Sequence, residues 1–184
     1  MAKGILERYS RTEDQRFIVD ITAQRAADLY NNFDRNTPYV RKDLATDLAD
    51  YLEDSVEELG KEAFVIQIHL LEPTTEDVLQ RIRTSVHNYF GYMKELEIRS
   101  LVRMMKVALT LLLAGLIILS LSVWVNQQLE EDTTVWQLIL AEGLTIAAWV
   151  SLWEALATFL INWLPHRRRI RLYKRITGAD IIFV

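Results

Sequence analysis

Residues 107–125 read VALTLLLAGLIILSLSVWV, a run of 19 residues without a charged side chain. At about 1.5 Å per residue, a helix of this length spans roughly 28 Å, close to the thickness of the hydrocarbon core of a bilayer. A second apolar stretch, 135–164, follows the polar segment NQQLEEDTT at 126–134. Its 30 residues exceed the roughly 20 that one crossing needs, so this helix is expected to tilt, to extend past the membrane face or to begin with an interfacial turn. The sequence therefore predicts a transmembrane helical hairpin over 107–164.

The charges of the chain are distributed so unevenly that they exclude a purely soluble protein. Of its 184 residues, 51% are hydrophobic and 25% are charged, and the net charge is −4; these averages suit an ordinary soluble domain. Yet none of the 21 Lys and Arg residues lies within 107–164. A nucleic-acid-binding protein would instead show an excess of basic residues on a soluble domain. Cysteine is absent from the sequence, which excludes disulfides, thiolate metal sites and cysteine nucleophiles.

The flanks of the two spans predict their orientation, because basic residues close to a span are retained on the cytoplasmic side. Arg99, Arg103 and Lys106 precede the first span, whereas the loop 126–134 has three acids and no base. The first residues of the chain contain no apolar run typical of a cleaved secretory signal. Both termini are therefore expected in the cytoplasm, with the acidic loop outside a cell inner (plasma) membrane. A second basic group, interpreted as a stop-transfer flank or a site for anionic lipid headgroups, comprises Arg167, Arg168, Arg169, Arg171, Lys174 and Arg175.

Two segments outside the hairpin, 17–22 and 63–71, have the β-branched residues and partial alternation of strands. Between them apolar residues recur at helical spacing, and Gly60 ends the pattern where a helix cap is expected. A strand, a crossover helix and a second strand form a βαβ unit with parallel strands. Residues 180–184 offer a third strand that would return to the same sheet after the hairpin. The helical stripe between the strands consists of Leu44, Leu48, Leu52, Val56 and Leu59.

The segment 74–106 is expected to be a stalk helix continuous with the first span. Glu76 and Asp77 lie in its first turn, where the helix dipole favours acids. Nothing before residue 107 clearly ends the helix, and Gly91 is the single expected kink. A stripe that could cover the sheet consists of Val78, Ile82, Val86 and Phe90.

The acidic residues of the second span are informative, since a carboxylate in hydrocarbon costs several kcal/mol and is retained only when it is paired, protonated or used. If Trp124 lies level with Trp136 in an antiparallel hairpin, Glu154 falls opposite Lys106. Glu154 is then interpreted as a salt-bridged or interfacial residue near the cytoplasmic side.

On the same alignment Glu142 falls opposite Ile118, deep in the first span. Three interpretations stay open: a protonated carboxyl bonded to Ser120 or to backbone, a contact with another subunit, or a proton or cation site beside Gly143. If the membrane part of the second span starts near Leu144, Glu142 belongs instead to an external interfacial turn.

Two further patterns in the spans concern helix packing. Trp149 and Trp153, one turn apart, form an aromatic face for lipid or for a partner helix. Small residues allow close approach of helices, and those in the two spans are Ala114, Gly115, Gly143, Ala147, Ala148, Ala155 and Ala157.

Asp20 and His69 lie on the more polar sides of their predicted strands and could be neighbours, as an acid–base pair. A lone Asp and His on a sheet face are more often structural. The sequence carries no nucleophile elbow, phosphate loop or metal-binding histidine motif. We therefore expect no enzymatic activity and no cofactor.

The expected function is that of an integral membrane scaffold or accessory subunit, whose cytosolic α/β domain docks partners and is rigidly coupled to a two-span anchor. Two spans can scarcely shield a substrate path, so the protein is expected to form a homo-oligomer or to join a larger membrane complex in the lipid bilayer, without nucleic acid. The alternative is an oligomeric ion or proton conduit that uses Glu142 and is gated by the cytosolic domain; a membrane enzyme using Asp20 and His69 is a third possibility. Alignment of Ser120 and Ser122 with Glu142 on one face would favour conduction.

The expected domains are a cytosolic α/β domain at 1–73, the stalk at 74–106, the hairpin at 107–164 and a basic segment with a possible strand at 165–184.

Overall fold

The computed structural model describes residue 4 and residues 6–31, 43–127 and 135–184. The fold is mixed, mostly helical with a small parallel sheet. The chain divides into two compact units. Unit 1 comprises Met1–Leu96 together with Arg169–Val184, and unit 2 comprises Glu97–Arg168.

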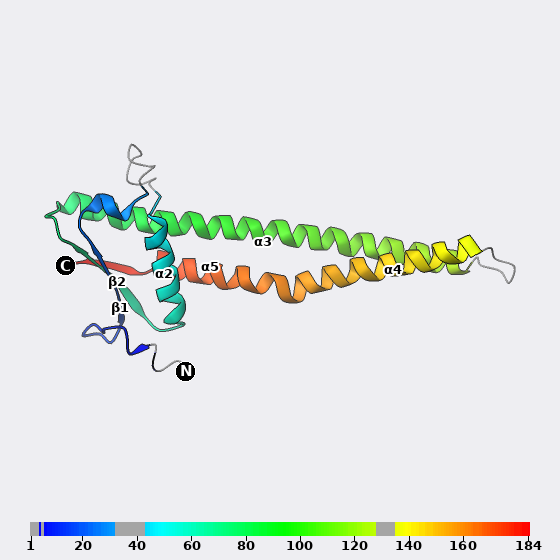
Figure 1. The fold of residues 1–184 in the computed structure, drawn as a ribbon, viewed down its shortest axis with the longest axis horizontal. Coiled ribbons are helices and arrows are strands. Elements are labelled where there is room, and N and C mark those ends of the chain that lie inside the picture. Colours follow the sequence, from blue (N-terminus) through cyan, green and yellow to red (C-terminus); the bar gives the residue numbers. More distant parts are fainter. Residues whose placement is uncertain (1–3, 5, 32–42, 128–134) are drawn as a thin grey trace. The chain divides into compact units, whose positions relative to one another are not determined.

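Unit 1 is built around a three-stranded sheet in the order β1-β2-β3, with both pairs parallel. The strands β1 (Phe17–Ala23) and β2 (Phe64–Leu70) are joined by the crossover helix α2 (Thr46–Glu58), which confirms the predicted βαβ unit. The strand β3 (Asp180–Phe183) pairs with β2, so the chain returns to this sheet after passing through unit 2. Figure 1 shows the three strands beside α2.

The core of unit 1 covers one face of the sheet. Along β1 the buried side chains alternate with more exposed ones, as the period of two in a half-buried strand requires. Helix α2 packs its predicted apolar stripe against this face. The first turns of α3 (Glu76–Gln127) also pack their apolar stripe against it. Each large apolar side chain buried in this way contributes roughly 1.5–3 kcal/mol to stability. The fully buried members include Phe17, Val19, Leu52, Val56, Ile66, Ile68, Ile82 and Phe90.

The segment after the second apolar stretch forms a helix that the sequence patterns do not predict. Helix α5 (Trp163–Thr177) buries Tyr173 and Ile176, spaced one turn apart, in the core of unit 1. The remaining short helix, η1 (Ala26–Leu29), follows β1. Helix α3 continues through Gly91 without a break.

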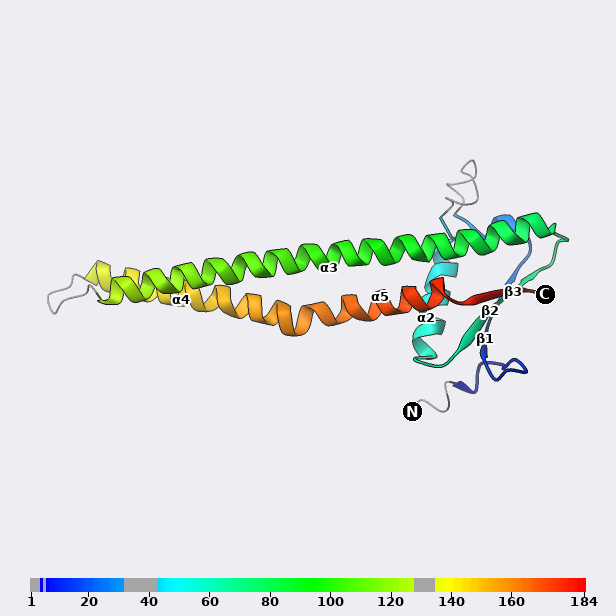
Figure 2. The same cartoon turned by 180° about the vertical axis from the view of Figure 1, so that it is seen from behind.

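Unit 2 contains the C-terminal part of α3 and the antiparallel helix α4 (Val135–Ala157), which lie side by side in both views (Figures 1 and 2). A π-helical turn, η4 (Thr158–Asn162), follows α4. Pro165 explains this turn, because its ring would clash with the carbonyl four residues earlier, that of Ile161. The wider π turn relieves the clash, and the Ile161 carbonyl accepts a hydrogen bond from the backbone of Trp163.

Candidate membrane hairpin and sheet face

The two helices of unit 2 meet along a seam of small side chains. In α3 these residues recur every seventh position, and in α4 they recur with the same period. A seven-residue repeat keeps one stripe of a helix facing its partner, and small residues let the two backbones approach closely. The seam comprises Ala108, Gly115 and Ser122 of α3 and Ala141, Ala148 and Ala155 of α4, all of them buried.

Two contacts fix the level of one helix against the other. A Cβ at Gly115 would lie only 3.1 Å from side-chain atoms of Leu152 and 3.2 Å from Ser151. Towards the end of the hairpin, the Ser122 and Thr145 hydroxyls are 2.7 Å apart. Thr145 donates its proton to the Ala141 carbonyl, so Ser122 is the donor in the bond between the two hydroxyls.

These contacts correct the expected alignment of the hairpin. Placing Trp124 level with Trp136 predicts Gly115 opposite Thr145, whereas Ser122 contacts Thr145 in the structure. The difference is seven residues, or about two helical turns. Both tryptophans are exposed, at 59% and 79%, so they do not determine the packing. The small residues of the seam do.

The corrected alignment changes the level of both acidic residues. By the contacts of Ser122 and Gly115, Glu142 lies level with Val125, at the end of the first predicted span, and Glu154 lies level with Leu113, near its middle. The expected position of Glu154 opposite Lys106 is therefore wrong. Both glutamates are exposed and have no hydrogen bond or ion pair with any residue that the structure describes.

The polar side chains of the first span do not form a single track with Glu142. Ser122 is buried in the seam, whereas Ser120 is exposed and donates to the carbonyl of Leu116 in its own helix at 2.8 Å. A bond between Ser120 and Glu142 is not formed. The alignment that would favour conduction through one chain is thus not observed.

The outer surface of unit 2 carries large apolar side chains. Trp149 and Trp153 are 65% and 69% exposed and point away from the seam. In each of the two helices only 17% of the most apolar window is buried, unlike the core helix of a soluble protein. Both helices are long and apolar enough to cross a membrane. Other large apolar side chains exposed on this surface are Leu113, Leu116, Ile117, Val150, Leu160 and Ile161.

A short hydrogen bond joins the two helical segments at the other end of unit 2. Glu97 Oε1 lies 2.6 Å from His166 Nδ1, and the two side chains are only 15% and 27% exposed. Nearby, the guanidinium of Arg167 stacks over the ring of Trp163 at 5.0 Å. Sequence patterns do not predict the contact of Glu97 with His166. The two residues are 69 positions apart, so their proximity can be inferred only once the alignment of the two helices is known.

Arg175 differs from the other residues of the predicted basic flank. Its guanidinium donates to the carbonyls of Val56, at 3.2 Å, and of Gly60 and Glu62, and it stacks on the ring of Phe64 at 5.0 Å. It thereby satisfies carbonyls at the C-terminal end of α2 and is not available to a lipid headgroup. The exposed members of the flank are Arg167, Arg168, Arg169, Arg171 and Lys174.

The predicted proximity of Asp20 and His69 is confirmed on the open face of the sheet. Asp20 Oδ1 lies 3.1 Å from His69 Nε2, and the amide nitrogen of Gln67 lies 2.8 Å from the same ring atom. Tyr51 of α2 donates its hydroxyl to the carbonyl of Asp20 at 3.0 Å. No Ser, Thr or Tyr hydroxyl is bonded to His69 in the described part of the chain. The pair therefore lacks the nucleophile that an acid–base relay would activate.

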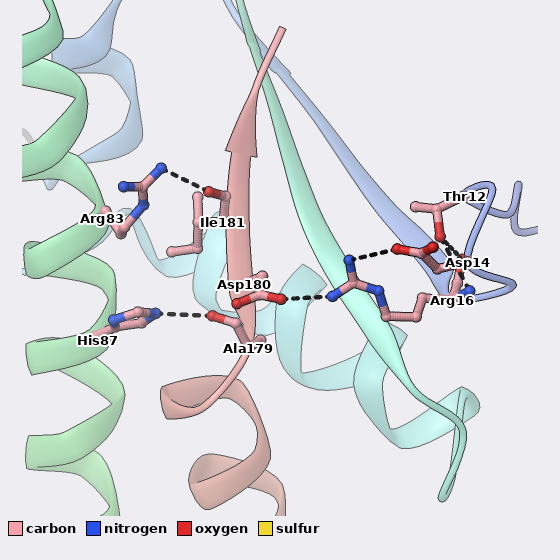
Figure 3. Close-up of polar contacts among 8 residues, drawn as sticks. All are labelled: Thr12, Asp14, Arg16, Arg83, His87, Ala179, Asp180 and Ile181. Atoms are coloured by element: carbon pink, nitrogen blue, oxygen red, sulfur yellow. Dashed lines mark hydrogen bonds and ion pairs between the residues drawn. The ribbon is translucent and has the colours of Figure 1, made fainter.

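Side chains also tie β3 into the sheet (Figure 3). Arg16 forms ion pairs with Asp180 of β3 at 2.6 Å and with Asp14 at 3.5 Å. On the other side of β3, Arg83 of α3 donates to the Ile181 carbonyl at 3.0 Å. His87 of α3 lies 3.1 Å from the carbonyl oxygen of Ala179. Because these outward carbonyls are occupied, this edge is protected from pairing with another strand.

A cavity of about 430 Å³ lies between α2, β1 and the N-terminal segment. From α2 it is lined by Tyr51, Asp54 and Glu58, and α2 contains six acids and no base. Tyr9 donates its hydroxyl to Glu58 at 2.7 Å, and burial raises the pKa of Tyr9. Arg8 is 3.7 Å from the same carboxylate. We call this cavity the acidic groove.

The described residues contain no group of three or more His, Asp or Glu side chains placed to hold a metal ion. No protein-family model matches the chain, and no curated protein and no solved structure is significantly similar to it.

Proposed function

We propose that the protein is an integral membrane scaffold or accessory subunit, in which unit 1 docks a partner and unit 2 is the membrane anchor. The observation that carries this proposal is the inverted composition of unit 2, with Ala148 and Gly115 inside and Trp149 and Trp153 outside. Soluble monomers rarely expose apolar patches of more than a few hundred Å². In a bilayer, by contrast, large apolar side chains face lipid and small residues mediate helix packing.

A docking role for unit 1 is supported by its open, polar surfaces. The acidic groove is lined by Asp20, Asp54 and Glu58, and His69 lies beside Asp20 on the sheet face. A surface of this charge suits a basic partner segment.

The proposed topology places both termini in the cytoplasm at the inner (plasma) membrane. Its support is the distribution of charge, because basic residues flank both helices on the side away from the acidic loop 126–134. Residues of α3 belong to both units, which supports coupling between the docking unit and the anchor.

Single-cysteine labelling tests the anchor and its orientation, since the native chain has no cysteine. Glu131→Cys should react with a membrane-impermeant maleimide in intact cells, whereas Lys61→Cys should react only after lysis. Both variants should stay in the membrane fraction at alkaline pH. Release at alkaline pH would contradict a membrane-spanning hairpin, and labelling of Lys61→Cys in intact cells would contradict the orientation.

Purification in a mild detergent tests the docking role. We expect a stoichiometric complex with a different protein, and a strictly monomeric species would count against a scaffold. Asp54→Lys in the acidic groove should remove the partner. Glu57→Lys, an exposed substitution on the same helix that does not line the groove, should retain it. Equal losses in the two variants would show that the groove is not the docking surface.

An oligomeric ion or proton conduit is the second candidate, favoured by the exposed carboxylate of Glu142, which pairs with no residue that the structure describes. Because the seam inside one hairpin is filled by small side chains, a conducting path would require several copies. Proton flux into liposomes should then fall in Glu142→Gln. Flux that survives this substitution would exclude Glu142 as the proton site.

A further inference from the structure

Glu154 lies near the middle of the proposed membrane hairpin. Ser151 and Leu152 contact Gly115, which is one residue from the centre of the span 107–125. Glu154 follows Leu152 by two residues, or about 3 Å along the helix axis. If unit 2 spans the bilayer, this carboxyl group therefore lies deep in the hydrocarbon.

The side chain of Glu154 points to the outer surface of unit 2. Its neighbours Trp153 and Val150 are 69% and 63% exposed, and no described residue pairs with Glu154. Ionisable side chains at this depth cost several kcal/mol and almost always pair with another group. The hairpin leaves that requirement unmet.

A second copy of this chain cannot supply an ion-pair partner. No Lys or Arg occurs in 107–164, and Lys106 lies seven residues from Leu113, which is about 10 Å from the level of Glu154. A copy in the same orientation would bring another Glu154 to that level. A positive charge that pairs with Glu154 at this level therefore has to come from a different protein.

The surface around Glu154 is shaped for the close approach of a helix. Gly143, Ala147, Val150 and Glu154 are spaced by four, three and four residues, so they share one face of α4. A Cβ at Gly143 would meet nothing within 4 Å, and Ala147 is exposed. Small residues of this spacing let transmembrane helices pack at short distance. We call these four residues the Glu154 face.

We propose that the Glu154 face docks a transmembrane helix of a different protein that carries Arg or Lys at mid-membrane depth. The inference rests on the proposed membrane function and specifies its partner. It also exchanges the roles expected for the two acids: Glu142, level with Val125 at the end of the span, is solvated by water and headgroups, and Glu154 needs a partner.

A defined probe tests this proposal: a polyleucine transmembrane peptide with one central Arg, compared with the same peptide carrying Leu there. The full-length protein, labelled at Lys61→Cys, is reconstituted in phosphatidylcholine vesicles, and binding is measured by energy transfer. We expect the Arg peptide to bind about tenfold more tightly than the Leu peptide, a difference in the range of intramembrane polar contacts. The preference should disappear in Glu154→Gln and persist in the matched control Glu142→Gln.

Flotation of the vesicles separates failure of this inference from failure of the proposed function. Protein that does not float with the vesicles would overturn both. Protein that floats but binds the two peptides equally, or keeps the Arg preference in Glu154→Gln, would overturn the inference alone. Energy transfer between protein copies that depends on Glu154 and needs no peptide would also overturn it, by assigning the Glu154 face to self-association.

Discussion

Arg175 shows that a charged residue of a basic segment can stabilise the folded core of unit 1. Its guanidinium donates to three carbonyls at and beyond the end of α2 and stacks on Phe64. Arg175→Ala should lower the stability of unit 1 by about 2 kcal/mol or more, because hydrogen bonds to a charged donor are lost and the carbonyls lose their partner. Arg171→Ala, an exposed neighbour, should change stability by less than about 0.5 kcal/mol. Thermal unfolding of the full chain in detergent measures both, and equal effects would contradict the capping role.

Glu53 gives unit 1 a dependence on pH. Burial raises the pKa of Glu53 above its ordinary value near 4.5, outweighing the hydrogen bond from Tyr173 and the charge of Arg169. An acid that binds its proton more tightly in the fold stabilises the fold below its folded pKa, and this contribution is lost as pH rises.

Glu53→Gln should therefore gain stability relative to the native chain between pH 4 and pH 7, while keeping an acceptor for Tyr173. Unfolding midpoints of the two proteins at both pH values test this. An unchanged difference between the proteins would contradict the expected cost of ionising Glu53.

At the scale of elements, the seam predicts which positions of the hairpin cross-link. The Ser122 and Thr145 hydroxyls are 2.7 Å apart, so the double variant Ser122→Cys/Thr145→Cys should form a disulfide readily on mild oxidation. Ser120→Cys/Thr145→Cys should not, because Ser120 lies on the exposed side of α3. Gly115→Leu should slow the first reaction, since a side chain there meets Leu152. Gly143 faces open space, so Gly143→Leu should leave the rate of the first reaction unchanged. Equal slowing by both substitutions would contradict the packing of the two helices along the seam.

The elements of unit 1 were largely predictable because their signals are local. Alternation along 17–22 and 63–71 identifies β1 and β2, and the stripe ending at Leu59 identifies α2. The contact of Asp20 with His69 follows from the same pattern once the strands are parallel. Helix α5 was not predicted, because its charged residues conceal the spacing of Tyr173 and Ile176.

The alignment of the hairpin was not predictable from aromatic residues. Tryptophan prefers the membrane interface, but that preference sets depth only loosely and does not fix how two helices pack. The period of seven that links Ala108, Gly115 and Ser122 was present in the sequence and indicates which face of the first span packs against α4, but not the level at which the two helices meet. Close packing determines that level, so the position of Glu154 follows from the contacts that Gly115 and Ser122 make in the structure.

At the scale of the whole molecule, the order of elements makes unit 2 an insertion into unit 1. The chain leaves the sheet after β2, passes through Glu97–Arg168 and returns as β3 between the same core residues. Because unit 1 has its own core, it should fold without unit 2 when residue 96 is joined to residue 169 by about ten Gly and Ser residues, a linker that reaches roughly 17 Å.

This excised protein should be soluble and unfold cooperatively, as judged by circular dichroism and size exclusion. A chain ending at residue 168 should lose cooperative unfolding of unit 1, because it lacks Tyr173, Ile176 and Ile181 and leaves Ile66 and Phe90 uncovered. Aggregation of the excised protein, under conditions where unit 1 of the full chain unfolds cooperatively, would show that the sheet needs unit 2 to fold. The two results together test whether β3 completes an independently folding domain. Such a domain should still fold when unit 2 is removed, and it should not fold when the C-terminal segment with β3 is removed.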